Sequence, residues 1–136
     1  MLLSKHRPRI KKNAFRFICL IGIVSLFADI TYEGARSING SFMAVLGASG
    51  TLVGLVAGAG ELVGYALRLV SGIISDKTKK YWLLTLIGYS VNLLAVPLLA
   101  FANQWPLAAS LMIAERLGKS IRTPARDVMI SQASSE

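Results

Sequence analysis

Three charged side chains occur at helical spacing inside an apolar stretch of this chain of 136 residues. Asp29, Glu33 and Arg36 follow one another at intervals of four and three, so an α-helix places them on one stripe, with Asn39 at its edge. A charge at the middle of a membrane-spanning helix costs about 2.5 to 3.5 kcal/mol on insertion scales. We therefore expect this stripe to face a polar cavity, a partner helix or itself, and not lipid.

Two interpretations of the stripe are open. In the first, Asp29 or Glu33 pairs with Arg36 along the same helix and only neutralises it. In the second, which we favour, the stripe lines a water-accessible path through a membrane.

A second set of charges lies on the next apolar segment. Glu61 and Arg68 share a face there, and a helix separates them by about two turns. We therefore expect each to pair with another helix and not with the other. A buried ion pair that holds a bundle together and a functional role are equally compatible with this pattern.

The composition indicates a membrane protein. Apolar residues make up 54% of the chain, charged residues only 16%, and the mean hydropathy is +0.56. This is too apolar and too poor in charge for an ordinary soluble domain. Because a spanning helix needs about 20 mostly apolar residues, the length suits about four spans with short connections. The expected fold is an all-α polytopic membrane protein of four transmembrane helices.

The segments that must position these charges are separated by short turns. A basic tail, 1–14, precedes a helical bundle, 15–136, with spans expected at about 15–46, 51–74, 81–102 and 105–120. The second span carries glycines four residues apart, at Gly50, Gly54 and Gly58 and again at Gly60 and Gly64. Small residues at this spacing let helices approach closely in lipid, so this span is predicted to be the packing spine. The last apolar run gives way to a basic stretch that is expected to break at Pro124.

The distribution of Lys and Arg predicts the orientation. Basic residues fill the N-terminal tail, the turn around 77–80 and the stretch from 116 onward, whereas the turns near 47–50 and 103–106 contain none. Basic loops that alternate with uncharged ones indicate four spans with both ends in the cytoplasm. The strong bias also argues against a dual-topology dimer.

Several functional classes find no support in the sequence. The net charge of +8 comes from residues that flank apolar runs, so we interpret it as a topology signal and expect no nucleic-acid partner. Cys19 and His6 are the single cysteine and the single histidine, and they do not form a metal-ligand set. There is no evident nucleophile with a base and no phosphate-binding loop. We expect no catalytic residue, no metal, no cofactor and no enzymatic activity.

The turn between the second and third spans carries a specific pattern. Gly72 is followed by Asp76, Lys77 and Lys80. With this turn, the chain resembles the N-terminal part of a major facilitator superfamily (MFS) transporter, whose corresponding loop has a glycine, an aspartate four residues later, and basic residues around a second glycine. Lys79 stands where that family has the second glycine. If the glycine serves a positive φ, Lys79 must accept strain of about 1 kcal/mol, or the turn must differ.

Two further stretches resemble the same family. The run from Asp29 to Arg36 resembles a charged first helix, and the stretch 115–127 resembles the cytoplasmic end of the fourth helix and the loop after it. The residues of this stretch that match are Glu115, Arg116, Arg122, Arg126 and Asp127. The family has about twelve helices in two similar halves. The resemblance therefore implies an N-terminal fragment, an incomplete half whose partners include the missing C-terminal helices.

The resemblance implies a secondary transporter that moves a small solute by alternating access in the lipid bilayer of a bacterial plasma (inner) membrane. Gly72, Asp76, Lys77 and Lys80 would form a gating loop that stabilises one state. Proton coupling is a hypothesis, motivated by acids at lipid depth. The residues that would line the path or couple protons are Asp29, Glu33, Arg36, Glu61 and Arg68.

Two other functions remain as alternatives. One is a non-transporting membrane subunit whose glycine-lined helix docks on a partner. The other is a small four-helix exporter acting as a dimer, which fits the size of the chain but not its charge bias or its motif-like turn.

Overall fold

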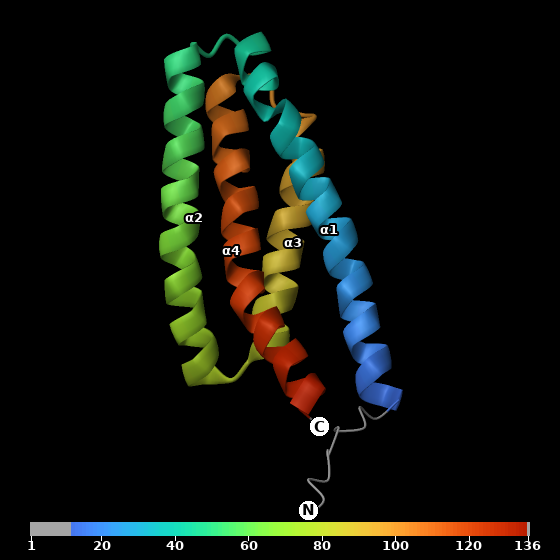
Figure 1. Ribbon diagram of the computed structural model, residues 1–136. Helices are drawn as coiled ribbons and strands as arrows, with labels where there is room; N and C mark the ends of the chain where they lie inside the picture. The colour runs from blue at the N-terminus through green and yellow to red at the C-terminus, as the bar shows by residue number, and fades with distance from the viewer. Residues whose placement is uncertain (1–11, 136) are drawn as a thin grey trace, which may run out of the picture.

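The computed structural model describes residues 12–135. This part is all-helical, as predicted, with α1 (Lys12–Val45), α2 (Gly50–Thr78), α3 (Tyr81–Leu99) and α4 (Trp105–Ser135). Short turns join the helices, so successive helices run in opposite directions (Figure 1). The start of α1, the α2–α3 turn and the end of α4 lie at one end of the bundle (Figure 1). Most of the predicted basic tail falls outside the described residues.

Three of the four helices are long and apolar enough to cross a membrane. These are α1, α2 and α3, judged by length and composition. Large apolar side chains such as Leu20, Phe27, Leu62 and Leu69 are exposed on α1 and α2, as expected of surfaces that face lipid. That α4 crosses the membrane, and that both ends are cytoplasmic, stay predictions.

The helix α4 is the most enclosed element of the bundle. It contacts each of the other three helices and lies between α2 and α3 in Figure 1. Its upper half contributes Ala108, Ala109 and Met112 to the apolar core, together with Met43 and Leu99. Its other half buries polar side chains, among them Glu115, Ser120 and Arg122. Polar groups in such a place need partners from the neighbouring helices.

The structure corrects the expected break at Pro124. The stretch after residue 120, expected as a loop, is helical, and α4 continues through Pro124 to Ser135. Proline has no N–H to donate to the carbonyl four residues earlier, which here belongs to Ser120. The Ser71 hydroxyl of α2 donates to that carbonyl at 2.9 Å. A neighbouring helix therefore supplies the donor that Pro124 lacks.

The glycine spine predicted on α2 is correct for only one of its two series. A Cβ added at Gly54 or Gly58 would meet no atom within 4 Å, whereas one at Gly60 would lie 2.5 Å from the Arg116 Nη1 atom of α4. The closest helix contact is instead between α3 and α4. A Cβ on Gly88 would lie 2.7 Å from the carbonyl oxygen of Gly118, and a Cβ on Gly118 would lie 2.7 Å from that of Gly88. These two backbones approach as closely as they do because neither residue has a side chain.

The end of α2 decides between the two alternatives for Lys79. Lys79 adopts a φ of 53° and a ψ of 17°, in the left-handed region, and its N–H donates to the Ser75 carbonyl at 2.9 Å. The turn therefore keeps the conformation that favours glycine, and Lys79 accepts the strain.

Candidate functional site

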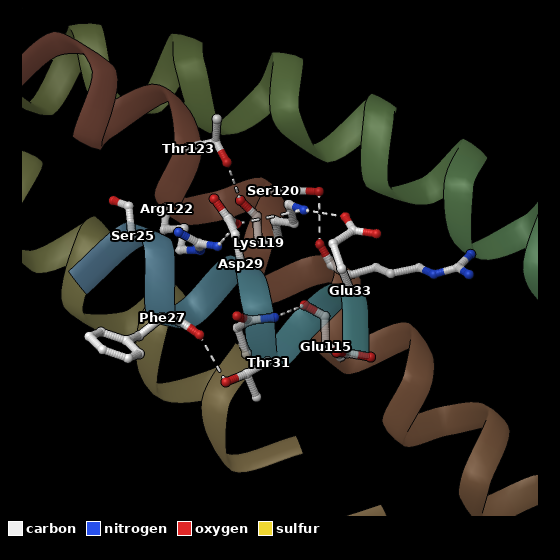
Figure 2. Close-up of polar contacts among 12 residues, drawn as sticks. Ser25, Phe27, Asp29, Thr31, Glu33, Glu115, Lys119, Ser120, Arg122 and Thr123 are labelled. Carbon is white, nitrogen blue, oxygen red and sulfur yellow. Dashed lines mark hydrogen bonds and ion pairs between the residues drawn. The ribbon is translucent and has the colours of Figure 1, made fainter. Parts of the chain in front are cut away.

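The charged stripe of α1 meets α4 at Asp29. Its carboxylate accepts from the Arg122 Nη2 atom at 2.7 Å and lies 3.7 Å from the Lys119 Nζ atom (Figure 2). The Arg122 side chain is completely buried, whereas Asp29 is 43% exposed. The ion pair therefore joins an enclosed cation to an acid that opens onto the surface of the bundle.

Aromatic and hydroxyl groups surround the Arg122 guanidinium. Its Cζ atom lies 4.6 Å from the centroid of the Tyr89 ring on α3, a cation–π contact. The Tyr89 hydroxyl in turn hydrogen-bonds the Ser25 hydroxyl of α1 at 2.8 Å. Within the described residues, the Nε and Nη1 atoms of Arg122 have no hydrogen-bond partner. Asp29 is thus the main polar partner of this buried cation.

Lys119 bridges two acids of α1. Besides Asp29, it contacts the Glu33 carboxylate at 3.3 Å (Figure 2), and its Nζ atom lies 3.6 Å from the centroid of the Tyr32 ring. Because one ammonium serves two carboxylates, either acid can release it while the other holds it.

Arg36 pairs across to α2 and not along α1. Its Nη2 atom lies 2.9 Å from the Glu61 carboxylate, and the Nη1 atom of Arg116 lies 3.8 Å from the same oxygen. The interpretation in which Arg36 is neutralised by Asp29 or Glu33 is therefore wrong. The expectation that Glu61 pairs with other helices is confirmed.

A glycine makes room for Arg116 beside α2. The guanidinium donates to the carbonyl of Ala57 and occupies the space that a Cβ at Gly60 would need. Arg116 therefore lies against the backbone of α2 while it contacts Glu61.

Arg68 of α2 differs from Arg36, Arg116, Lys119 and Arg122 in its contacts. Within the described residues it has no carboxylate within 4.0 Å, so the expected pairing with another helix is not found there. Its Cζ atom lies 5.8 Å from the centroid of the Tyr65 ring, one turn earlier on α2.

Glu115 and Asn92 form a second polar contact inside the bundle. Glu115 is 1% exposed, and the Asn92 side chain donates to its backbone carbonyl at 3.1 Å. Asn92 was visible in the sequence as a polar interruption of an apolar segment, but nothing there indicated its partner. The same holds for Ser25 and Tyr89, which sequence reasoning did not select.

Two hollows, both lined by Arg36, Glu61 and Arg116, open between α1, α2 and α4. The larger, of about 360 Å³, has Arg36, Glu61 and Arg116 on its wall and otherwise mostly apolar residues. The smaller, of about 140 Å³, shares these three residues. Its remaining lining residues are Tyr32, Gly60, Gly64, Tyr65, Arg68, Lys119 and Ser120.

The expected gating residues lie apart from this network. Gly72, Asp76 and Lys77 belong to the last turns of α2, and Lys80 directly precedes α3. No described residue forms an ion pair with Asp76. In the C-terminal third of α4, the Arg126 and Asp127 side chains pair with each other at 2.8 Å. In the described part, no ion pair therefore links the expected gating residues to another helix.

Comparisons with known proteins found relatives that match almost the whole chain. The chain is 30% identical over 130 residues to an uncharacterized MFS-type transporter of Methanocaldococcus jannaschii. The alignment covers 96% of this chain and 32% of that protein. The chain is similar to part of an MFS-type transporter. It is also 47% identical over 133 residues to uncharacterized proteins of Mycobacterium tuberculosis and Mycobacterium bovis.

The extent of these matches is limited. The chain spans about a third of the length of the curated relatives it matches, since the aligned part is 32% of each. No family model matches the chain, and no solved structure matches it.

Proposed function

We propose that the chain is part of an MFS-type secondary transporter that moves a small solute across a bacterial plasma membrane by alternating access. The similarity to an uncharacterized MFS-type transporter over 96% of the chain supports this. So do three helices that are apolar and long enough to span a bilayer. The observation that carries the proposal is the set of ion pairs that link α1 to α2 and α4.

Two charged groups in this set each have two partners of opposite charge, so the helices can move without leaving either group unpaired. Glu61 lies between two guanidiniums and Lys119 between two carboxylates. When helices shift by an ångström or two, as in known switching transitions, such a group exchanges one partner for the other and is never left without one. A charge at lipid depth that lost every partner would cost several kcal/mol.

Asp29 is the residue best placed to couple solute movement to protons. Its exposure lets a proton reach the carboxylate, and protonation removes the charge that holds Arg122. Within the described residues Arg122 would then lose its ion-pair partner while Lys119 keeps Glu33, which changes the contacts between α1 and α4.

The test uses the product of the complete reading frame in proteoliposomes. We expect a solute from a cell extract to accumulate in these vesicles and not in empty ones, as measured by mass spectrometry, and an imposed pH gradient to change that accumulation several-fold. Asp29→Asn should abolish the effect of the gradient, whereas Asp127→Asn should retain it, because within the described residues the Asp127 carboxylate pairs with its neighbour Arg126 alone. If no solute accumulates, transport is refuted. Accumulation that ignores the gradient refutes proton coupling alone.

One observation favours a second candidate, a non-transporting membrane subunit. A Cβ added at Gly54 or Gly58 of α2 would meet no atom of the described chain within 4 Å, so a helix of another protein has room to approach there. Co-purification of the chain with a larger membrane protein, lost on Gly58→Leu, would support that function over transport.

A further inference from the structure

We infer that the smaller hollow between α1, α2 and α4 binds the anionic group, a carboxylate or a phosphate, of an organic solute. This inference rests on the proposed transport function and names the class of substrate. The charge of the hollow, the free cation in it and the apolar hollow beside it carry the argument.

The lining of the hollow is strongly basic. Four cations contribute to it, and Glu61 is the only acid among its lining residues; the cations are Arg36, Arg68, Arg116 and Lys119. Glu61 is shared by Arg36 at 2.9 Å and Arg116 at 3.8 Å, so one carboxylate serves two guanidiniums. The hollow thus keeps an excess of positive charge.

Acids outside the hollow reduce this excess but do not cancel it. Asp29 and Glu33 both contact Lys119 and so neutralise that cation, and Asp29 is shared with Arg122, which lies outside the hollow. Glu115 points into the interior of the bundle, where it is 1% exposed. Arg68 consequently has no carboxylate partner in the described part of the chain.

The positions of the donors suit an anion. A guanidinium presents a planar set of N–H groups that matches a carboxylate or a phosphate. Arg68 is held near the ring of Tyr65, with its Cζ atom 5.8 Å from the centroid. The hydroxyls of Tyr32 and Tyr65 are further polar groups among the lining residues, whereas the Ser120 hydroxyl already donates to the Arg116 carbonyl at 2.9 Å. Arg68 belongs to a helix that is apolar and long enough to span a membrane, where a cation without a partner is costly, and a bound anion would neutralise it.

The adjoining hollow indicates what the rest of the solute is. It shares Arg36, Glu61 and Arg116 with the smaller one, but Met43, Val53, Val56 and Met112 make most of its wall apolar. The smaller hollow, of about 140 Å³, suits a single anionic group, and the larger, of about 360 Å³, suits a short apolar body. A solute with an anionic head and an apolar tail fits both.

Binding is tested with three probes. Two of them have the same apolar part and opposite charges, and the third is an anion without an apolar part. The product of the complete reading frame is placed in phosphatidylcholine nanodiscs, and calorimetry measures the Kd of butyl phosphate, butyltrimethylammonium and inorganic phosphate. Butyl phosphate should bind saturably, inorganic phosphate more weakly, and butyltrimethylammonium not at all. Arg68→Gln should weaken butyl phosphate binding about tenfold or more, and Arg68→Lys should recover part of the loss. Arg16→Gln, an exposed change on α1 outside the hollow, should alter the Kd less than about twofold.

The outcomes separate this inference from the transport proposal. Wild-type protein that binds no butyl phosphate, or Arg68→Gln protein that binds it unchanged, overturns the inference even where a solute accumulates in proteoliposomes. Butyl phosphate binding without transport supports the inference and refutes the proposed function. In nanodiscs with phosphatidylglycerol, binding that persists identifies a free solute as the source of the anion. A different result would be that phosphatidylglycerol alone protects the wild type against thermal unfolding while butyl phosphate binds in neither lipid. The bound anion would then be a lipid headgroup, and the inference that a free solute binds would be overturned.

Discussion

Lys79 shows how one backbone conformation is maintained at the end of a helix without glycine. Its φ of 53° places it in the left-handed region, and its N–H closes the last turn of α2 on the Ser75 carbonyl. A residue with a Cβ pays about 1 to 2 kcal/mol in this region. The turn to α3 requires it, because α3 already begins at Tyr81.

Replacement of this lysine by glycine should stabilise the chain. Lys79→Gly removes the Cβ strain, and the greater freedom of glycine in the unfolded state offsets part of the gain. We expect the free energy of unfolding to rise by about 0.5 to 1 kcal/mol, as measured by denaturant titration in detergent micelles. Lys80→Gly is the matched control, since Lys80 has a φ of −88° and no such strain to relieve. A loss of stability in both variants would contradict the strain.

At the scale of helices, the most polar element is also the most enclosed. The helix α4 contacts every other helix, and its buried Arg122 meets Asp29 of α1 and the Tyr89 ring of α3. This arrangement needs α3 and α4 to pack backbone against backbone, which Gly88 and Gly118 permit. Burial of polar groups and close packing of backbones therefore occur together on one helix.

The glycine contact predicts a large effect of a small side chain. A Cβ in Gly118→Ala would lie 2.5 Å from the backbone nitrogen of Asn92, so α3 must move away. We expect a loss of about 1 to 3 kcal/mol in the free energy of unfolding of the chain in micelles. Gly58→Ala, where a Cβ meets no atom within 4 Å, should be neutral or stabilising by up to about 1 kcal/mol. Equal losses in the two variants would contradict the close contact.

The Ser71 hydroxyl, which replaces the donor that Pro124 lacks, leads to a second prediction on the stability of the chain. Ser71→Ala leaves the buried carbonyl of Ser120 without the donor that it now has at 2.9 Å, at a cost of about 1 to 3 kcal/mol in unfolding free energy. Ser37→Ala is the control, because the Ser37 hydroxyl is exposed and donates only within its own helix; it should change stability by less than about 0.5 kcal/mol. If Pro124→Ala made Ser71→Ala harmless, the hydroxyl would be shown to act through the proline.

At the scale of the whole molecule, the basic turn, the start of α1 and the end of α4 share one end of the bundle (Figure 1). This is the arrangement that the distribution of Lys and Arg predicts for a bundle with that end in the cytoplasm. The turns that lack Lys and Arg, between α1 and α2 and between α3 and α4, lie at the opposite end (Figure 1).

The orientation is testable by cysteine labelling. In a Cys19→Ser background, which removes the only cysteine, Lys80→Cys and Gln104→Cys place single thiols at exposed positions at the two ends of the bundle. A membrane-impermeant maleimide should label Gln104→Cys in intact cells and Lys80→Cys only after permeabilisation. Labelling of both in intact cells would mean a mixed orientation and would contradict the charge-based prediction.

What the sequence determined by itself is local. Apolar runs of spanning length, the turns between them and the spacing of Asp29, Glu33 and Arg36 along one face follow from hydropathy and helical period, which act within one segment. The left-handed turn at Lys79 was one of two alternatives that the resemblance left open, and the structure decided between them.

Tertiary structure alone decided which groups meet. Asp29 and Arg122 are separated by 93 positions, and nothing within either segment specifies the register that brings them together. The same is true of the helical path through Pro124, which needs Ser71 of another helix, and of the glycine contact between α3 and α4. In each case a buried polar group or a close backbone is stable only with its distant partner, so the choice of partner depends on how the helices pack.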